Sequence, residues 1–233
     1  LTSVLVVPYR EPLLTAKLLA TIDHLSGGRT ILGCGTGWMP EEFVAVGAPP
    51  YAERGAVTDE YIDIYRELWT KENPSFKGRY RSFDDIWFEP KPNRKPHPPI
   101  WIGGESKAAM KRAVARGDAW FPIGCNPKMP LDSVKRYGAA IGRLGQMAEE
   151  AGRDPATIDH AYWSVWTHGT GKPATAGDGE RMLLTGSADD IAGDLAAMKG
   201  LGVNHVLFNF LANSREKTCD RIEAFAAEVL AKL

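Results

Sequence analysis

Two glycine-rich turns are the parts of this sequence best suited to bind a ligand, because backbone without a side chain can approach a flat ring or a phosphate closely. The first is Gly33-Cys34-Gly35-Thr36-Gly37-Trp38, and the second is Gly103-Gly104-Glu105-Ser106. Both are expected at the carboxyl end of a strand, where parallel-sheet proteins place their ligand sites. The two turns therefore predict a site for a planar ring with an anionic tail.

The first turn does not fit a dinucleotide-binding fingerprint. Its third glycine would fall at Trp38, and no acidic residue ends a strand about 20 residues later. The second turn has two interpretations. Free amides at the positive end of a helix dipole suit a phosphate, whereas Ser106 would equally serve as the N-cap after a tight turn. Glu105 weighs slightly against a phosphate, because like charges repel.

Cysteines and histidines give weaker signals. Cys34 has no histidine near it in the sequence, and a buried structural cysteine is commoner than a nucleophile. No two of the five histidines are three to five residues apart, which disfavours a metal-assisted hydrolase. Only His168 is expected in a loop after a strand, where a catalytic group would lie. His24 is expected to cap or pack a helix end, and Glu53 and Arg54 to form a surface ion pair.

These residues must be positioned by the surrounding elements, and apolar runs alternate with segments of helical period, as in βα units around a parallel sheet. Strands are expected at 3–7, 30–33, 100–102, 119–121, 158–165 and 205–208. Helices are expected at 13–25, 54–69, 106–116, about 131–151, after Ser187 and from Ser214. The glycine-rich segment 167–179 is expected to be a mobile loop.

Residues 71–99 interrupt this alternation, and their aromatic runs at 76–80 and 86–88 predict a short antiparallel excursion within a single domain of residues 1–233. Six βα units are fewer than the eight of a (β/α)8 barrel, which has about 250 residues. The sequence opens at Leu1, without methionine, inside an apolar run. We therefore expect a barrel cut before its third strand, with a doubly wound sheet as the alternative.

Composition limits the partners. The 233 residues include 28 Lys or Arg and 29 Asp or Glu, so the chain lacks the basic excess of nucleic-acid-binding proteins. No apolar run approaches the roughly 18 residues that span a bilayer. Three scattered cysteines fit a reducing compartment. We expect a cytoplasmic protein that acts on a small molecule and binds neither nucleic acid nor a membrane.

The chain resembles the luciferase-like monooxygenase superfamily, and within it the branch of oxidoreductases that use the deazaflavin coenzyme F420. The likeness rests on motifs in residues 1 to about 124: Thr2-Ser3-Val4-Leu5, Pro8-Tyr9-Arg10, Leu25-Ser26-Gly27-Gly28-Arg29, the first glycine-rich turn with Glu41-Glu42-Phe43, Glu53-Arg54-Gly55, Pro98-Pro99-Ile100-Trp101-Ile102-Gly103-Gly104 and Gly117-Asp118-Ala119-Trp120. Members fold as (β/α)8 barrels with an insertion near the middle. The resemblance thus implies that Leu1 begins the third strand and that the first two βα units are absent.

The resemblance also implies roles for individual residues. In the family the pair at Ser3 and Val4 often forms a non-prolyl cis peptide beneath the cofactor ring, and the second glycine-rich turn forms the phosphate cradle. The implied cofactor-binding residues are Ser3, Val4, Val6, Gly35, Gly103, Gly104, Glu105 and Ser106. The residues expected to face the substrate are Trp38, Arg10 and His168. The catalytic residues themselves are expected in the missing N-terminal part.

One departure narrows the substrate. Sugar-phosphate dehydrogenases of the superfamily have a glutamate proton donor at the position of Trp38 and a cofactor-contacting asparagine at that of Glu41, so a sugar phosphate is disfavoured. The expected function is hydride transfer between F420 and a small organic substrate. The alternatives are an FMN-dependent monooxygenase and a non-catalytic flavin or deazaflavin carrier on the same scaffold. Because relatives commonly dimerise, a homodimer is a possible assembly.

Overall fold

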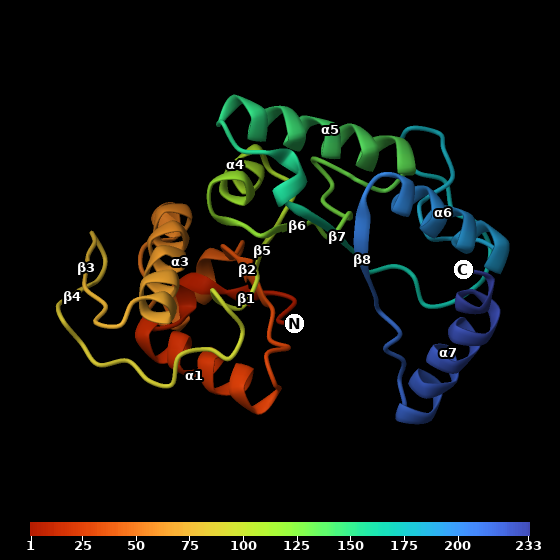
Figure 1. Cartoon of the computed structure of the whole chain (residues 1–233). Helices are drawn as coiled ribbons and strands as arrows, with labels where there is room; N and C mark the ends of the chain where they lie inside the picture. Colours follow the sequence, from red (N-terminus) through yellow and green to blue (C-terminus); the bar gives the residue numbers. More distant parts are fainter. The chain divides into compact units, whose positions relative to one another are not determined.

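The computed structural model describes residues 1–233, which divide into two compact units. The first unit is Leu1–Gly103 with Lys111–Ala119, and the second is Gly104–Met110 with Trp120–Leu233. Each unit combines parallel strands with the helices that connect them (Figure 1). None of the helices is both long enough and apolar enough to cross a membrane.

Three strands of the first unit, β1 (Leu5–Val6), β2 (Leu32–Gly35) and β5 (Ile100–Gly103), pair in parallel in that order. Its helices are α1 (Pro12–Leu25), α2 (Pro40–Ala45), α3 (Arg54–Thr70) and most of α4 (Lys107–Arg116), with the 3-10 turns η1 (Val7–Tyr9) and η2 (Tyr51–Glu53). Apart from α2, every one of these strands and α-helices was predicted to within a few residues of its observed ends.

Helix α3 supplies the core of the first unit. The apolar side chains that recur three or four residues apart along it are buried: Val57, Tyr61, Ile64, Tyr65 and Leu68. The indole of Trp69 donates a 3.1 Å hydrogen bond to the Ala16 carbonyl of α1. On α4, the Arg116 guanidinium binds both carboxylate oxygens of Asp63 at 2.9 Å. Helix α3 is therefore tied to a neighbour on each side.

Helix α1 turns its most apolar face to solvent. The sequence places four large side chains on one face, and they are exposed by 67, 61, 50 and 85%: Leu14, Leu18, Ile22 and Leu25. The opposite face is buried through residues such as Ala16, Leu19 and Ala20, and α1 packs against α3. Periodicity therefore identified this helix, but the large apolar side chains do not mark its buried face.

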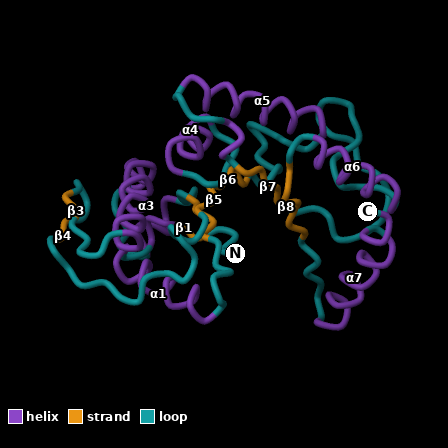
Figure 2. Tube along the Cα trace, in the orientation of Figure 1, coloured by secondary structure: helices purple, strands orange, loops and turns teal.

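The interruption at 71–99 contains a hairpin of β3 (Phe76–Lys77) and β4 (Ser82–Phe83). The predicted antiparallel excursion is present, but its second strand lies at 82–83 and not in the aromatic run at 86–88. The rings of Phe76 and Phe83 stack 6.1 Å apart, and the Glu60 carboxylate accepts the N–H groups of the turn at 79–81 over 2.7 to 2.9 Å. A carboxylate of α3 thus holds the turn of the hairpin. Residues 84–99 continue as an irregular loop (Figure 2).

The second unit contains β6 (Ala119–Phe121) from Trp120 onward, β7 (Asp159–Ser164) and β8 (Val203–Phe208). Its helices are the start of α4, α5 (Val134–Glu150), α6 (Ala188–Gly200) and α7 (Arg215–Glu228), with the 3-10 turns η3 (Pro155–Thr157) and η4 (Leu230–Lys232). Strands β7 and β8 pair in parallel. Helices α5, α6 and α7 each begin after a serine whose side chain accepts an N–H three residues on, as predicted for Ser187.

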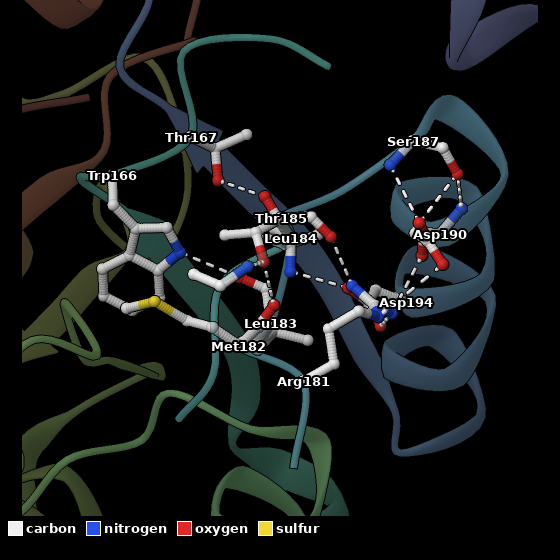
Figure 3. Close-up of polar contacts among 11 residues, drawn as sticks. Trp166, Thr167, Arg181, Met182, Leu183, Leu184, Thr185, Ser187, Asp190 and Asp194 are labelled. Carbon is white, nitrogen blue, oxygen red and sulfur yellow. Dashed lines mark hydrogen bonds and ion pairs between the residues drawn. The ribbon is translucent and has the colours of Figure 1, made fainter. Parts of the chain in front are cut away.

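The segment between β7 and α6 includes residues 167–179, which were expected to be mobile, and hydrogen bonds hold the residues at both ends of that stretch (Figure 3). The indole of Trp166 donates to the Leu183 carbonyl, and the Thr167 hydroxyl to the Leu184 carbonyl, both at 2.8 Å. The Arg181 guanidinium binds both oxygens of Asp194, a buried residue of α6. Because Asp194 belongs to the next helix, the composition of the loop gave no indication of this attachment.

Candidate functional site

The first glycine-rich turn begins at the edge of the sheet where β2 and β5 end. Cys34 lies beside Ile102 in the parallel pairing, so the residues that follow, Gly35 and Gly103, end their strands next to each other. Val6 pairs with Gly35 from the other side. The carboxyl ends of three strands thus form one edge within the first unit, which is the position where α/β proteins bind ligands.

The predicted cis peptide between Ser3 and Val4 is present. A Cβ built on Gly35 would lie 2.6 Å from Cγ2 of Val4, so the space that a side chain would need is already filled by valine. Val4 and Val6 are themselves half-buried, and Ser3 is exposed. A planar ring placed here would therefore contact the apolar side chains of these two valines and the backbone of Gly35.

The second turn, residues 103–106, has a fixed backbone. Gly104 has a φ of +103°, a conformation that residues with a side chain rarely adopt, and a Cβ there would approach the Ala109 methyl to 3.3 Å. The buried Trp120 indole donates a 2.8 Å hydrogen bond to the Gly104 carbonyl. Gly104 itself is half-exposed, so its backbone is not sealed under protein.

Glu105 points its carboxylate away from the turn. The side chain is 8% exposed and accepts hydrogen bonds from the backbone N–H of Ile123 at 2.8 Å and of Gly124 at 3.2 Å. The amide of Asn126 donates to the other oxygen at 3.3 Å. These contacts hold the carboxylate on the residues that follow β6. Only the backbone of Glu105 remains to contact a ligand in the turn.

Ser106 caps helix α4. Its hydroxyl oxygen accepts the N–H of Ala109 at 3.1 Å, and its carbonyl accepts the N–H of Met110 at 2.9 Å. The hydroxyl proton is still free to be donated, since a serine hydroxyl is both donor and acceptor. The first N–H groups of a helix have no intrahelical partner, so this turn presents donors and a positive dipole end to an anion. The capping and the anion-binding interpretations are therefore compatible.

Trp38 and Arg10 lie on the surface of the first unit. Trp38 is 75% exposed, and its carbonyl accepts a 3.1 Å hydrogen bond from the Tyr51 hydroxyl. The ring of Tyr51 packs edge-on against Phe43 of α2, at 5.3 Å between centroids. Arg10 is exposed and follows η1. Helix α2, which the sequence did not predict, thus supports the backbone around Trp38.

The sequence did not predict a tyrosine–glutamate pair next to Arg10. The Tyr9 hydroxyl donates a 2.7 Å hydrogen bond to Oε2 of Glu42, and the Tyr9 ring packs on Phe43 at 4.8 Å. Burial and the neighbouring carboxylate raise the pKa of Tyr9 to about 12. The two residues are 33 positions apart, and no spacing rule connects them. The pair holds η1 against α2 beside Arg10.

His168 belongs to the second unit and follows β7, as expected. Its Nδ1 lies 2.6 Å from the carbonyl oxygen of Asn209, which follows β8. It lines a pocket of about 390 Å³ in the loop between β7 and α6. Trp38 and Arg10 are parts of the first unit, so the three predicted substrate-facing residues are divided between the two units.

The remaining candidates have structural roles. Cys34 is buried, and burial raises the pKa of its thiol to about 12, so it is not an activated nucleophile. His24 contacts the Lys91 carbonyl at 2.6 Å near the end of α1. The predicted ion pair of Glu53 with Arg54 was wrong: Glu53 binds Arg79 at 2.7 Å, because the hairpin brings that guanidinium over it, and Arg54 stacks on Tyr51.

Comparison with known proteins identifies the family. The profile of the luciferase-like monooxygenases matches residues 1–168. This chain belongs to that family. Among its relatives is an FMNH2-dependent dimethylsulfone monooxygenase of Pseudomonas putida, 30% identical over 259 residues that cover 94% of this chain and 70% of the relative.

Solved structures of other oxidoreductases show the same fold. The monooxygenase RslO1 from Streptomyces bottropensis superposes with a TM-score of 0.75 at 19% identity, over 98% of this chain and 76% of its own. An F420-dependent secondary alcohol dehydrogenase, solved with an F420–acetone adduct, gives a TM-score of 0.72 at 21% identity, over 96% and 76%. The predicted α/β fold of the luciferase-like barrel proteins is confirmed, and the chain is an enzyme of the oxidoreductase type.

Proposed function

We propose that this luciferase-like enzyme transfers a hydride between the deazaflavin coenzyme F420 and a small organic substrate. The observation that supports the proposal is the 103–106 turn. Its backbone is fixed by Trp120, its one carboxylate is engaged by the backbone of Ile123 and Gly124, and the first turn of α4 points N–H donors at the same place. These features suit the phosphate that F420 and FMN both carry.

The residues then take the following roles. The cofactor supplies the hydride chemistry, and the protein supplies position and electrostatics. Val4 and Val6, with the Gly35 backbone, pack against the ring and exclude water from one of its sides. The backbone of Gly103, Gly104 and Glu105 with the Ser106 hydroxyl binds the phosphate. Arg10 and Trp38 contact the substrate, and Trp38 acts as a pocket wall because an indole N–H is not acidic at neutral pH.

An FMN-dependent monooxygenase is the second candidate. A specific observation favours it, since the relative at 30% identity over most of this chain uses FMNH2 on dimethylsulfone. The F420-dependent branch is favoured by the motif series in residues 1 to about 124 and is represented among the solved structures of the same fold. The two candidates share the phosphate-binding turn and differ in the ring.

Absorbance titration of the purified protein with F420 and, separately, with FMN tests the proposal. We expect saturable F420 binding, followed by hydride exchange with alcohols, aldehydes or enones. FMN binding with no F420 affinity would replace the proposal with the monooxygenase. The variant Gly104→Ala should weaken binding of either cofactor about tenfold or more, because a Cβ strains the turn.

The matched control for that variant is Gly142→Ala. Gly142 lies in α5, and a Cβ built there meets no atom within 4 Å. Alanine in a helix interior is more favourable than glycine by about 1 kcal/mol, so the control should fold and bind cofactor like the natural protein. Equal cofactor affinity in the two alanine variants would show that the 103–106 turn does not bind the cofactor.

A further inference from the structure

The His168 pocket lies in the second unit at the carboxyl ends of β7 and β8. Two segments that adjoin α6 and β7 surround it, and the lining includes Thr167, His168, Lys172, Thr185 and Arg221. The backbone around the pocket is held by hydrogen bonds that do not involve Lys172 or Arg221. Gly171 donates to the Gly186 carbonyl at 2.7 Å, and Figure 3 shows Thr167 directed at Leu184. The pocket is therefore a built feature of the loop.

The charged side chains that line this pocket are all basic. Lys172 is exposed in the loop, and Arg221 of α7 donates one N–H to the Leu211 carbonyl at 2.6 Å, which leaves further guanidinium donors for a ligand. No carboxylate lines the pocket, and the acid next to it, Glu228, accepts the hydroxyl of Thr170 at 2.7 Å. The three threonine hydroxyls of the pocket already donate their protons to other groups, so the donors left for a carboxylate, phosphate or sulfonate are the two cations.

The orientation of the His168 ring is also defined. The carbonyl of Asn209 can only accept, so Nδ1 of His168 carries the proton in their 2.6 Å contact. In the neutral ring, Nε2 then carries a lone pair and can only accept a hydrogen bond. The contact fixes the ring between the ends of β7 and β8.

We propose that the His168 pocket binds an oxyanion group of the substrate, held by Lys172 and Arg221 with His168 beside them. Barrel enzymes build their sites from the loops at this face, and the loops after the last two strands are a frequent place for an anion. That the anion belongs to a substrate rests on the oxidoreductase function proposed above. The binding of an anion here does not depend on that function.

Titration with inorganic phosphate, and separately with methanesulfonate, tests the anion site. With ring-15N-labelled histidine, we expect a saturable shift of the His168 signals in the natural protein. Lys172→Ala should weaken the affinity about tenfold, since one charge-assisted hydrogen bond is lost. Arg221→Lys, which keeps the charge, should weaken it less. Lys135→Ala, at an exposed position of α5, is the control and should bind like the natural protein. No saturable shift, or equal affinity in Lys172→Ala, would overturn the proposal.

A second arm separates a substrate anion from the phosphate of the cofactor. F420 and FMN affinities are measured on the same Lys172→Ala protein. Unchanged cofactor affinity supports a substrate site, whereas a loss of cofactor affinity matching the loss for phosphate would assign the pocket to the cofactor and overturn the proposal. If the natural protein binds neither cofactor, the proposed function fails, while the phosphate titration still decides whether the pocket binds an anion.

Discussion

The indole N–H of Trp120 donates a 2.8 Å hydrogen bond to the carbonyl oxygen of Gly104. Trp120 is fully buried, and its ring lies 5.9 Å from that of Tyr137, which in turn lies 4.8 Å from Tyr162. An aromatic core in the second unit thus holds the donor in place. The backbone of the candidate phosphate turn depends on the packing behind it as much as on its own glycines.

Replacement Trp120→Phe should lower cofactor affinity, because the ring is retained but the bond to Gly104 is lost. We expect about a five- to tenfold weaker complex and about 1 to 3 kcal/mol less folding free energy. Absorbance titration and urea unfolding measure the two effects. The control is Trp166→Phe, which loses an equivalent 2.8 Å bond to the Leu183 carbonyl. It should lose stability but keep its cofactor affinity, and equal loss of affinity in both variants would contradict the role given to Trp120.

Asp194 is the centre of the network that fastens the loop between β7 and α6. It is 5% exposed and accepts both the Arg181 guanidinium and, at 2.6 Å, the N–H of Leu184 (Figure 3). Asp194→Ala leaves the N–H of Leu184 without an acceptor, whereas Arg181 keeps its bonds to two backbone carbonyls. We therefore expect a loss of about 1 to 3 kcal/mol in urea unfolding. The free loop should also become sensitive to proteolysis.

Asp189→Ala is the matched control for that variant. Asp189 is on the same helix and pairs with Lys232 at the surface, at 2.6 Å. Exposed ion pairs contribute at most about 1 kcal/mol, so this variant should remain close to the natural protein in both measurements. Similar losses for Asp189→Ala and Asp194→Ala would mean that the buried network does not stabilise the loop.

The three cysteines should differ in reactivity. Cys125 and Cys219 are exposed, whereas Cys34 is buried and burial raises the pKa of its thiol to about 12. A thiol-specific reagent should therefore modify two cysteines in the native protein and the third only after unfolding. Cys34→Ala should keep full cofactor affinity. Rapid modification of Cys34 in the folded protein, located by mass spectrometry of its peptides, would show that this thiol is accessible.

The strands and long helices were predictable because their signals are local. Period-3.6 spacing of Val57, Tyr61 and Leu68 marked α3, and serine at position 187 marked the start of α6. Local spacing does not indicate which element a helix packs against. The exposed stripe of α1 has the same spacing as the buried stripe of α3, and only packing of α1 against α3 decides which face is covered.

The glycines of the candidate site were predictable from the sequence, whereas the residues that hold them in place were not. The 103–106 turn was evident from the sequence because Gly103 and Gly104 stand between a strand and a helix. The bonds that make it usable come from Trp120, Ile123 and Gly124, which are 16 to 19 residues from their partners. The Tyr9–Glu42 pair spans 33 positions. Such contacts follow from chain topology, which no residue spacing encodes.

His160 should make the stability of the protein depend on pH. Its Nδ1 is buried without a hydrogen-bond partner, and burial lowers the pKa of the ring. The unfolded chain, with an ordinary histidine pKa of about 6.5, therefore binds a proton that the folded chain resists. Folding stability contributed by the neutral ring is present above about pH 6.5 and is lost as the pH falls from there towards the lowered value. Urea unfolding of the natural protein and of His160→Leu, compared between about pH 7.5 and 5, measures this. The variant should show the flatter curve, and parallel curves would mean that His160 contributes nothing to the acid sensitivity.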